Sequence, residues 1–309
     1  MYQVKAKLQL KPNHFYKLLT NLYFFYNYIA RIYNIQQIQI KTDNLITKEK
    51  IDTYIEKIPP SSKILQVTLK LLNEGELSKA AQIASQDLAL SAYLKDLVNK
   101  PLYGFKTEVK DINQIFGILG VAKSQQTVYN YMINLLSPDK WQLFKLNKKS
   151  FANLQAELST SWQKITSHLH IEDKEIQSAI SLLPASIIVS EALFNDKIED
   201  VNLIRSVNPI DLNTILQRLC HVDLFDICQQ IAQKWEMSPE IAQIIQAASG
   251  LKPSEDEQIN MLGKWMHLLL FYTLSKPNYI EAELNDFIEF QIDYVGDIYD
   301  DFASLMEIA

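Results

Sequence analysis

Hydrophobic residues recur every three or four positions along almost the whole chain, and strict alternation of hydrophobic and polar residues is rare. Spacing of this kind is typical of amphipathic α-helices, whereas alternation is typical of strands, so the pattern predicts an all-α protein. The first predicted helix has an unusually aromatic stripe, which consists of Phe15, Leu18, Leu22, Phe25, Ile29 and Ile32. We expect a packing helix, with a dimerisation or partner face as the alternative, and a polar linker over residues 36–44.

Residues suited to helix ends divide the next stretch into a series of short helices. Asp87 and Asp111 each precede a hydrophobic run, and their carboxylates can accept the first free backbone N–H groups of a helix. Gly120 is expected to close one helix and Ser124 to open the next. Residues 137–138, a Ser-Pro pair, predict another start, because proline is favoured at the first helical position. Short helices with short connections predict a compact bundle.

The last stretch of the chain, from Pro277 on, carries nine acidic side chains and no Lys or Arg. Its hydrophobic residues keep helical spacing, at Leu284, Phe287, Ile288, Ile292, Val295, Ile298 and Phe302. This combination predicts one or two docked amphipathic helices with an acidic outer face. The chain is therefore divided into an N-terminal aromatic helix and linker (1–50), a first lobe (51–136), a second lobe (137–276) and an acidic C-terminal extension (277–309).

Composition narrows the function classes. Only 7 of the 309 residues are glycine, and neither a phosphate-binding G-x-x-x-x-G-K loop nor a Rossmann glycine triplet occurs. This counts against an all-β fold and against a nucleotide-binding α/β fold. The formal net charge is −6, with 30 basic and 36 acidic residues, which gives no general attraction to nucleic acid or anionic lipid.

The cysteines and the hydropathy profile predict a cytoplasmic protein without a membrane span. Cys220 and Cys228 lie eight residues apart in a helical pattern, about 12 Å along a helix, which is too far for a disulfide. Unpaired cysteines fit a reducing compartment. The start of the sequence lacks an apolar signal core, and the most apolar windows, 18–33 and 261–274, are both interrupted by polar residues.

Five short segments between residues 58 and 241 follow one another in an order that is typical of a known domain family. They are Ile58-Pro59-Pro60, Ile83 to Leu90, Val98 to Gly104, Ile112 to Gly120, and Trp235 to Ile241. In that order they resemble the opening proline pair, the I-x-x-D-P-A-L stretch, the A-N-S-x-x-Y-G turn, the I-x-x-A-x-x-x-L-G helix and the W-x-L-P-x-x-I helix start of the HDOD domain. Leu88 stands where that family usually has proline, and Pro239 comes one place late. The resemblance covers residues 58 to about 275 and implies a two-lobed helical bundle of the HD/HDOD type.

HDOD domains are related to HD-type metal-dependent phosphohydrolases, which bind metal ions through histidines and aspartates and activate a water molecule. The resemblance places Pro184 and Ala185 at the His-Asp pair of those hydrolases. It places Lys164 and Leu224 at further histidine positions. It also places Ala248 and Ser249 at a pair of adjacent histidines. Proline, alanine and leucine side chains offer no ligand atom, so the resemblance implies a vestigial site without metal, cofactor or catalytic residues.

Three local clusters suggest other chemistry, and each has a simpler structural explanation. They are His168, His170, Glu172 and Asp173; Cys220, His221, Asp223 and Asp226; and Lys140, Lys145, Lys148 and Lys149 with Trp141 and Phe144 between them. The first two could bind a metal ion, and the third could contact phosphate groups. The alternatives are a solvated helix end, a capping or packed histidine, and an exposed linker.

Three functions stay open on the sequence alone. The first is a non-catalytic HDOD-type regulatory protein that acts through protein–protein or ligand binding, with an unidentified protein partner or a second copy of itself. The second is an HD-type phosphohydrolase with an atypical ligand set. The third is a nucleic-acid or small-ligand binder, which the acidic C-terminal extension disfavours for nucleic acid. The lost ligand positions favour the first.

Overall fold

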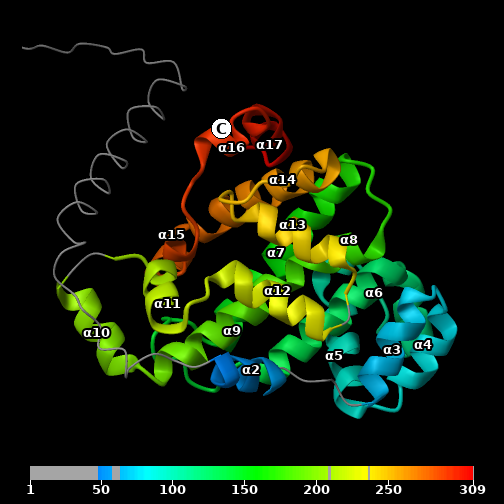
Figure 1. Ribbon diagram of the computed structural model, residues 1–309. Helices are drawn as coiled ribbons and strands as arrows, with labels where there is room; N and C mark the ends of the chain where they lie inside the picture. Colours follow the sequence, from blue (N-terminus) through cyan, green and yellow to red (C-terminus); the bar gives the residue numbers. More distant parts are fainter. Residues whose placement is uncertain (1–47, 58–62, 208–209, 236, 309) are drawn as a thin grey trace, which may run out of the picture.

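The protein is built from helices (Figure 1). The computed structural model describes residues 48–57, 63–207, 210–235 and 237–308, and these contain α-helices and short 3-10 helices but no strand. This confirms the all-α prediction. The aromatic stripe of residues 15–32, the linker after it and the proline pair at 59–60 lie outside the described residues.

The first lobe is a bundle of short helices with its own hydrophobic core. It comprises α3 (Lys63–Asn73), α4 (Leu77–Ala84), α5 (Leu88–Val98), η2 (Pro101–Tyr103) and α6 (Ile112–Leu136). The core contains Leu65, Leu72, Leu90, Leu94, Val98, Phe116 and Met132, among others. Asp87 and Asp111 cap α5 and α6 as predicted, because their carboxylates accept backbone N–H groups of the first turns.

The second lobe is larger and surrounds one central helix. Its elements are α7 (Lys148–His168), α8 (Lys174–Ser178), η3 (Ala179–Ser181), α9 (Leu182–Asn195), α10 (Ile198–Val207), α11 (Leu212–Cys220), α12 (Leu224–Lys234), α13 (Pro239–Ala248) and α14 (Glu257–Leu274). Helix α9 packs against α7, α10, α11 and α12, and most of its residues are buried. A helix that is apolar on every side needs neighbours on every side, which the other helices of this lobe supply.

Helix α2 (Lys48–Lys57) packs on the second lobe, against α9 and α12. Ile51 and Ile55 are buried in that lobe's core, and the Lys234 Nζ donates to the backbone oxygen of Ile55 at 2.8 Å. These contacts join α2 to the second lobe rather than to the helices that directly follow it. The domain boundaries derived from the sequence stay a prediction.

Helix α6 carries the chain from the first lobe to the second, with a break at Gly120. That residue has φ 70° and ψ 174°, a conformation that is essentially restricted to glycine. The helix resumes directly afterwards, so the prediction that Ser124 opens a new helix is wrong. Ser124 is instead fully buried within the second part of α6.

A set of buried polar side chains, here called the polar seam, lies along the second part of α6 and on α7, which packs against it. We define it by Ser124, Gln125, Gln126 and Thr127 of α6 with Gln155 and Ser159 of α7, all of which are buried. Several of its polar atoms, such as Gln126 Nε2 and Gln155 Oε1, have no hydrogen-bond partner among the described protein atoms. Above it, Trp235 stacks on Tyr129 with ring centroids 5.1 Å apart and contacts both hydrophobic cores.

The segment between α6 and α7 is irregular, so the prediction of a helix start at Ser137-Pro138 is wrong. Residues 137–147 contain no helix, and α7 begins after Asn147, whose side chain forms a capping box with Ser150. The reason is the buried carboxylate of Glu191 on α9, which is 1% exposed. Its oxygens accept backbone N–H groups from three consecutive residues, Gln142, Leu143 and Phe144. A helix through this segment would direct those donors elsewhere.

The C-terminal extension is docked on the second lobe, as predicted, but it forms several short helices. They are α15 (Pro277–Glu281), η4 (Asn285–Phe287), α16 (Ile292–Val295) and α17 (Tyr299–Leu305). Leu284, Phe287, Val295 and Phe302 are buried, while Asp293, Asp300 and Asp301 are exposed. The hydrophobic positions therefore hold the segment in place and leave an acidic outer face.

Within the described part of the chain, one helical stretch, Lys174–Asn195, has the length and apolar composition to cross a membrane. Of its apolar window, 89% is buried inside the protein, as is usual for a core helix.

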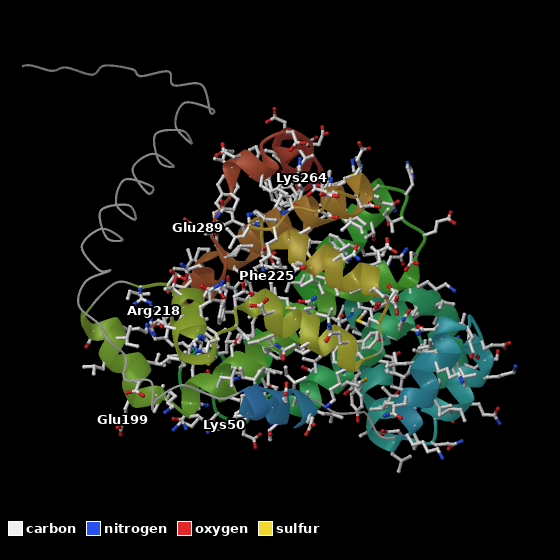
Figure 2. All side chains as sticks on the ribbon, in the orientation of Figure 1. Lys50, Glu199, Arg218, Phe225, Lys264 and Glu289 are labelled. Carbon is white, nitrogen blue, oxygen red and sulfur yellow. The ribbon has the colours of Figure 1, made fainter. Side chains whose placement is uncertain are left out.

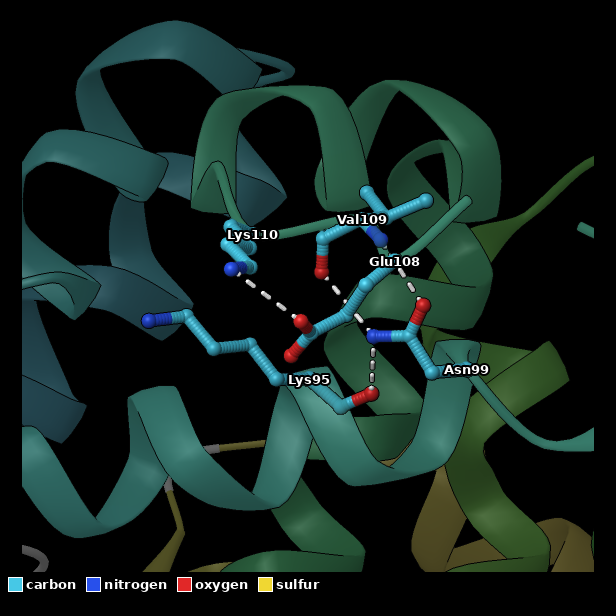
Figure 3. A network of polar contacts seen from close by, with 5 residues as sticks. All are labelled: Lys95, Asn99, Glu108, Val109 and Lys110. Carbon is cyan, nitrogen blue, oxygen red and sulfur yellow. Dashed lines mark hydrogen bonds and ion pairs between the residues drawn. The ribbon is translucent and has the colours of Figure 1, made fainter. Parts of the chain in front are cut away.

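The loop after α5 is held by one amide side chain (Figure 3). Asn99 donates to the backbone oxygens of Lys95 and Val109, both at 2.9 Å, and accepts from the Val109 N–H at 2.8 Å. These bonds satisfy both backbone groups of the buried Val109 and close the loop of residues 100–108. Lys110 and Glu108 form an ion pair on the exposed side of the same loop.

Replacing Asn99 by alanine is expected to destabilise the first lobe. Two buried backbone groups of Val109 lose their partners, which corresponds to about 2 kcal/mol in the free energy of unfolding. Urea denaturation followed by circular dichroism measures the change. Asn202→Ala, at an exposed position of α10, is the control and should change the same quantity by less than about 0.5 kcal/mol. Equal effects of the two substitutions would contradict the role given to Asn99.

Replacing Glu191 is expected to loosen the irregular segment between the lobes. Glu191→Ala leaves three backbone N–H groups without their acceptor and should lower the free energy of unfolding by about 3 kcal/mol. Hydrogen exchange should accelerate at residues 142–144 before it changes elsewhere. Glu199→Ala, at an exposed carboxylate of α10, should leave both measurements nearly unchanged.

Candidate functional site

The centre of the second lobe holds a small apolar cavity, which we call the central cavity. It has a volume of about 10 Å³, roughly the least that admits a single water molecule. Its lining comes from η3, α9, α12, α13 and α14 and comprises Ala179, Ile180, Leu182, Leu183, Phe225, Cys228, Ile245, Met266 and Leu270. Phe225 is labelled in Figure 2, within the second lobe. Side chains, rather than open space, therefore fill the middle of this lobe.

Cys228 supplies the only thiol on the wall of the central cavity among the described residues, and burial keeps it protonated. Its Sγ lies 3.1 Å from the Ser186 Oγ, and Ser186 in turn donates to the Leu183 backbone oxygen at 2.8 Å. Burial raises the pKa of the Cys228 thiol to about 12. Because the thiolate is the nucleophile and the metal ligand, this cysteine is suited to packing rather than to chemistry. Both cysteines are free, as the sequence predicted.

Three of the predicted vestigial positions lie close to the central cavity. Pro184 and Ala185 are in the first turn of α9, and Leu224 is the first residue of α12; all three are buried. Leu183 precedes Pro184 and Phe225 follows Leu224, and both of these neighbours line the cavity. The structure thus brings the first turns of α9 and α12 together, and the side chains that meet there are hydrocarbon.

The other predicted positions, Ala248, Ser249 and Lys164, are also not among the residues that line the central cavity. Ala248 is buried at the end of α13, and the Ser249 hydroxyl donates to the Gln246 backbone oxygen at 2.7 Å. Lys164 is exposed on α7, and its Nζ pairs with Glu307 at 3.1 Å. A surface ion pair of this kind does not converge on the central cavity. The correspondence of these residues with hydrolase ligands stays a prediction.

Sequence reasoning passed over His267, which the fold buries completely beside the end of α13. Its Nδ1 donates to the Ala248 backbone oxygen at 2.9 Å, because its Nε2 accepts the Gln291 backbone N–H at 3.3 Å. This pair of bonds requires the neutral ring with one defined tautomer. Burial lowers the pKa of His267 to about 4. The ring therefore joins α14 to α13 and to the C-terminal extension. The only sequence signal was a polar residue within the apolar run of 261–274.

The two histidine clusters proposed from the sequence are helix ends. His168 packs on Trp265 with ring centroids 5.6 Å apart, and His170 follows α7 with φ 56°. His221 ends α11 in the left-handed conformation, and Asp223 caps α12 in a capping box with Asp226. Among the described residues, no group of three or more His, Cys, Asp or Glu side chains is placed to hold a metal ion.

The lysine patch is partly neutralised, and its aromatic residues are not available for stacking. Lys145 pairs with Glu283 at 3.1 Å and Lys148 with Asp139 at 2.6 Å. Trp141 is 7% exposed and Phe144 is 1% exposed, since both belong to the core of the second lobe. A surface that stacks nucleic-acid bases needs exposed aromatic rings.

Comparison with known protein families shows which family has this sequence pattern. The HDOD domain family matches residues 58–250, which is more than half of the chain and includes both lobes as far as the end of α13. The chain belongs to the HDOD domain family. That family is related to the HD-type phosphohydrolases. No curated protein sequence matches the chain significantly.

Solved structures with the same fold include other HDOD proteins. An HDOD domain protein of unknown function from Geobacter sulfurreducens is 14% identical, with a TM-score of 0.53, over 84% of this chain and 97% of that one. A "putative phosphohydrolase" from Shewanella amazonensis is 15% identical, with a TM-score of 0.58, over 83% of this chain and 97% of that one. At these identities the likeness shows the HDOD fold and leaves the chemistry to the residues of this chain.

The buried His267 predicts a pH dependence of stability. Its pKa is about 4 in the folded protein and 6.5 when unfolded, so the unfolded state binds the proton more readily between these values. The free energy of unfolding should therefore fall as the pH is lowered from 6.5 towards 4, by roughly 3 kcal/mol from this group. Urea denaturation at several pH values measures this slope.

The variant His267→Gln should be less stable at pH 7 but should lose the part of the slope that depends on the imidazole. His168→Gln, at an exposed histidine, is the matched control and should keep the wild-type slope. A wild-type slope in His267→Gln would show that other groups cause it.

Proposed function

We propose that this HDOD protein is a non-catalytic regulatory protein of the cytoplasm that acts by binding a protein or a ligand. One observation supports the proposal, namely the mostly hydrocarbon side chains that meet at the centre of the second lobe, near the positions where the resemblance places metal ligands of the related hydrolases. Hydrolysis by an HD-type centre needs imidazole and carboxylate groups from several helices, because the metal must be held while it activates water.

The described residues that line the central cavity include no imidazole or carboxylate side chain. The side chains of Pro184, Ala185 and Leu224 have no lone pair to donate. The side-chain heteroatoms on the described cavity wall are the Cys228 thiol, which bonds to the Ser186 hydroxyl, and the Met266 thioether. Burying a divalent cation there without charged ligands would cost far more than such a site returns.

The phosphohydrolase alternative draws support from the names of two structural neighbours from Shewanella amazonensis, both called putative phosphohydrolases. Those proteins share 15% and 14% of their aligned residues with this chain, so their names do not transfer to it. A nucleic-acid function has less support, because Lys145 and Lys148 are paired and Trp141 and Phe144 are buried.

Metal analysis and activity assays of the purified full chain test the proposal. We expect substoichiometric transition metal by plasma mass spectrometry, and no turnover of phosphomonoesters or cyclic dinucleotides after addition of Mn²⁺ or Fe²⁺. Stoichiometric metal together with turnover would establish the hydrolase instead.

The double variant Pro184→His with Ala185→Asp supplies a sharper control. It returns a His-Asp pair to the first turn of α9, where the neighbouring side chains are hydrocarbon. We expect loss of stability by several kcal/mol, about 3 or more, without gain of metal, because a buried unpaired carboxylate is costly. Tight metal binding by this variant would reveal that the remaining ligands are present.

A further inference from the structure

A groove lies on the outer face of the helix pair α12 and α13, which pack side by side at the front of the molecule in Figure 1. Its volume is about 280 Å³. The described residues that line it are Gln229, Ala232, Gln233, Met237, Ser238, Pro239, Ala242 and Gln243. Ala232, Met237 and Ala242 are buried and form the floor, whereas Gln233 and Gln243 are exposed on the rim.

The groove has an apolar floor and a rim of glutamine side-chain amides. None of the described residues that line it is charged, and each glutamine amide can both donate and accept a hydrogen bond. The volume lies just below the usual range for pockets that enclose a small organic ligand. An occupant would therefore be a peptide segment that places one or two large side chains on the floor and neutral polar groups at the rim.

The N-terminal segment of this chain has that chemistry and an opposite charge to the rest. Residues 1–47 contain six basic residues and one acidic residue, a net charge of +5, which leaves −11 on residues 48–309. The segment also contains six tyrosines and three phenylalanines. Tyrosine combines an apolar ring with a hydroxyl that bonds to amides, so it suits an apolar floor with a glutamine rim.

The segment is attached to the start of α2, a helix that packs on α12. The bond between the Lys234 Nζ and the Ile55 backbone oxygen, at 2.8 Å, joins the other end of α2 to the end of α12 that lines the groove. The start of α2 lies about 10 Å along the helix from that contact. Residues 33–47 separate the aromatic stripe from α2, and fifteen residues can span up to about 50 Å. The stripe can therefore reach the groove of its own chain. The opposite net charges of residues 1–47 and residues 48–309 raise the local concentration of the stripe near the rest of the protein.

We infer that residues 15–32 dock in the α12–α13 groove of the same chain, with Leu22 and Phe25 of the aromatic stripe on the floor. The docked segment covers the groove, so an external partner of this face must displace it. The inference does not depend on whether the second lobe is catalytic, and its failure would leave the proposed function untouched.

Photo-cross-linking in the full-length protein tests the contact. Gln243 is replaced by p-benzoylphenylalanine, the protein is irradiated, and linked peptides are identified by mass spectrometry. We expect links from position 243 to residues 15–32, in a product with the mass of a single chain. Links only in a product with the mass of two chains would assign the groove to a second copy and overturn the inference, as would the absence of links to residues 1–47.

Substitutions within the segment add a control of matched charge. Leu22→Asp with Phe25→Asp removes two hydrophobic stripe positions and should lower the cross-link yield at least tenfold. Thr20→Asp with Asn27→Asp introduces the same charge on the face opposite the stripe and should keep most of the yield. Equal yields from both pairs would overturn the docking through the stripe.

Limited proteolysis tests the same contact from the side of the groove. Gln233→Lys with Gln243→Lys adds positive charge at the rim, which repels the basic segment and should accelerate chymotrypsin cleavage within residues 15–32 several-fold. Gln82→Lys with Gln258→Lys, at exposed positions on α4 and α14, is the control and should leave cleavage unchanged. An unchanged rate in the groove variant, with the fold intact by circular dichroism, would contradict the inference.

Discussion

Helix α9 runs through the second lobe with twelve of its fourteen residues buried, and the rest of that lobe is arranged to keep water away from it. Such a helix can form only where other helices cover all its sides, and α2, α7, α10, α11 and α12 do so. The same burial dictates what its polar residues do. The carboxylate of Glu191 is tolerated because it accepts backbone N–H groups, and in doing so it sets the irregular path of residues 142–144.

The helical nature of the chain, its family and several helix ends could be predicted from the sequence. Hydrophobic spacing and caps such as Asp87 and Asp111 act locally, so a local pattern is enough to find them. The pattern failed at residues 137–138, where a Ser-Pro pair of helix-starting type lies in an irregular segment. There a partner about fifty residues away, Glu191, decides the conformation, and no local pattern reports it.

The residues of the central cavity could be predicted from the sequence only in part, for the same reason. The resemblance to HD-type hydrolases directed attention to the first turns of α9 and α12, which do meet at the central cavity. It gave no indication of Met266 and Leu270, which α14 supplies to the cavity from far along the chain, or of His267 on the same helix. Lys164, grouped with the site by alignment, is a surface residue paired with Glu307. Tertiary contacts between distant segments are what the alignment of motifs leaves out.

The two lobes are each held by a hydrophobic core of their own, whereas the polar seam along α6 and α7 is rich in amide and hydroxyl groups. Parting the lobes would hydrate these groups, several of which lack partners among the described residues. Opening either lobe internally would expose the full core. The apolar contacts across this boundary include Trp235, which stacks on Tyr129, and Ile133 of α6, which is buried in the core of the second lobe.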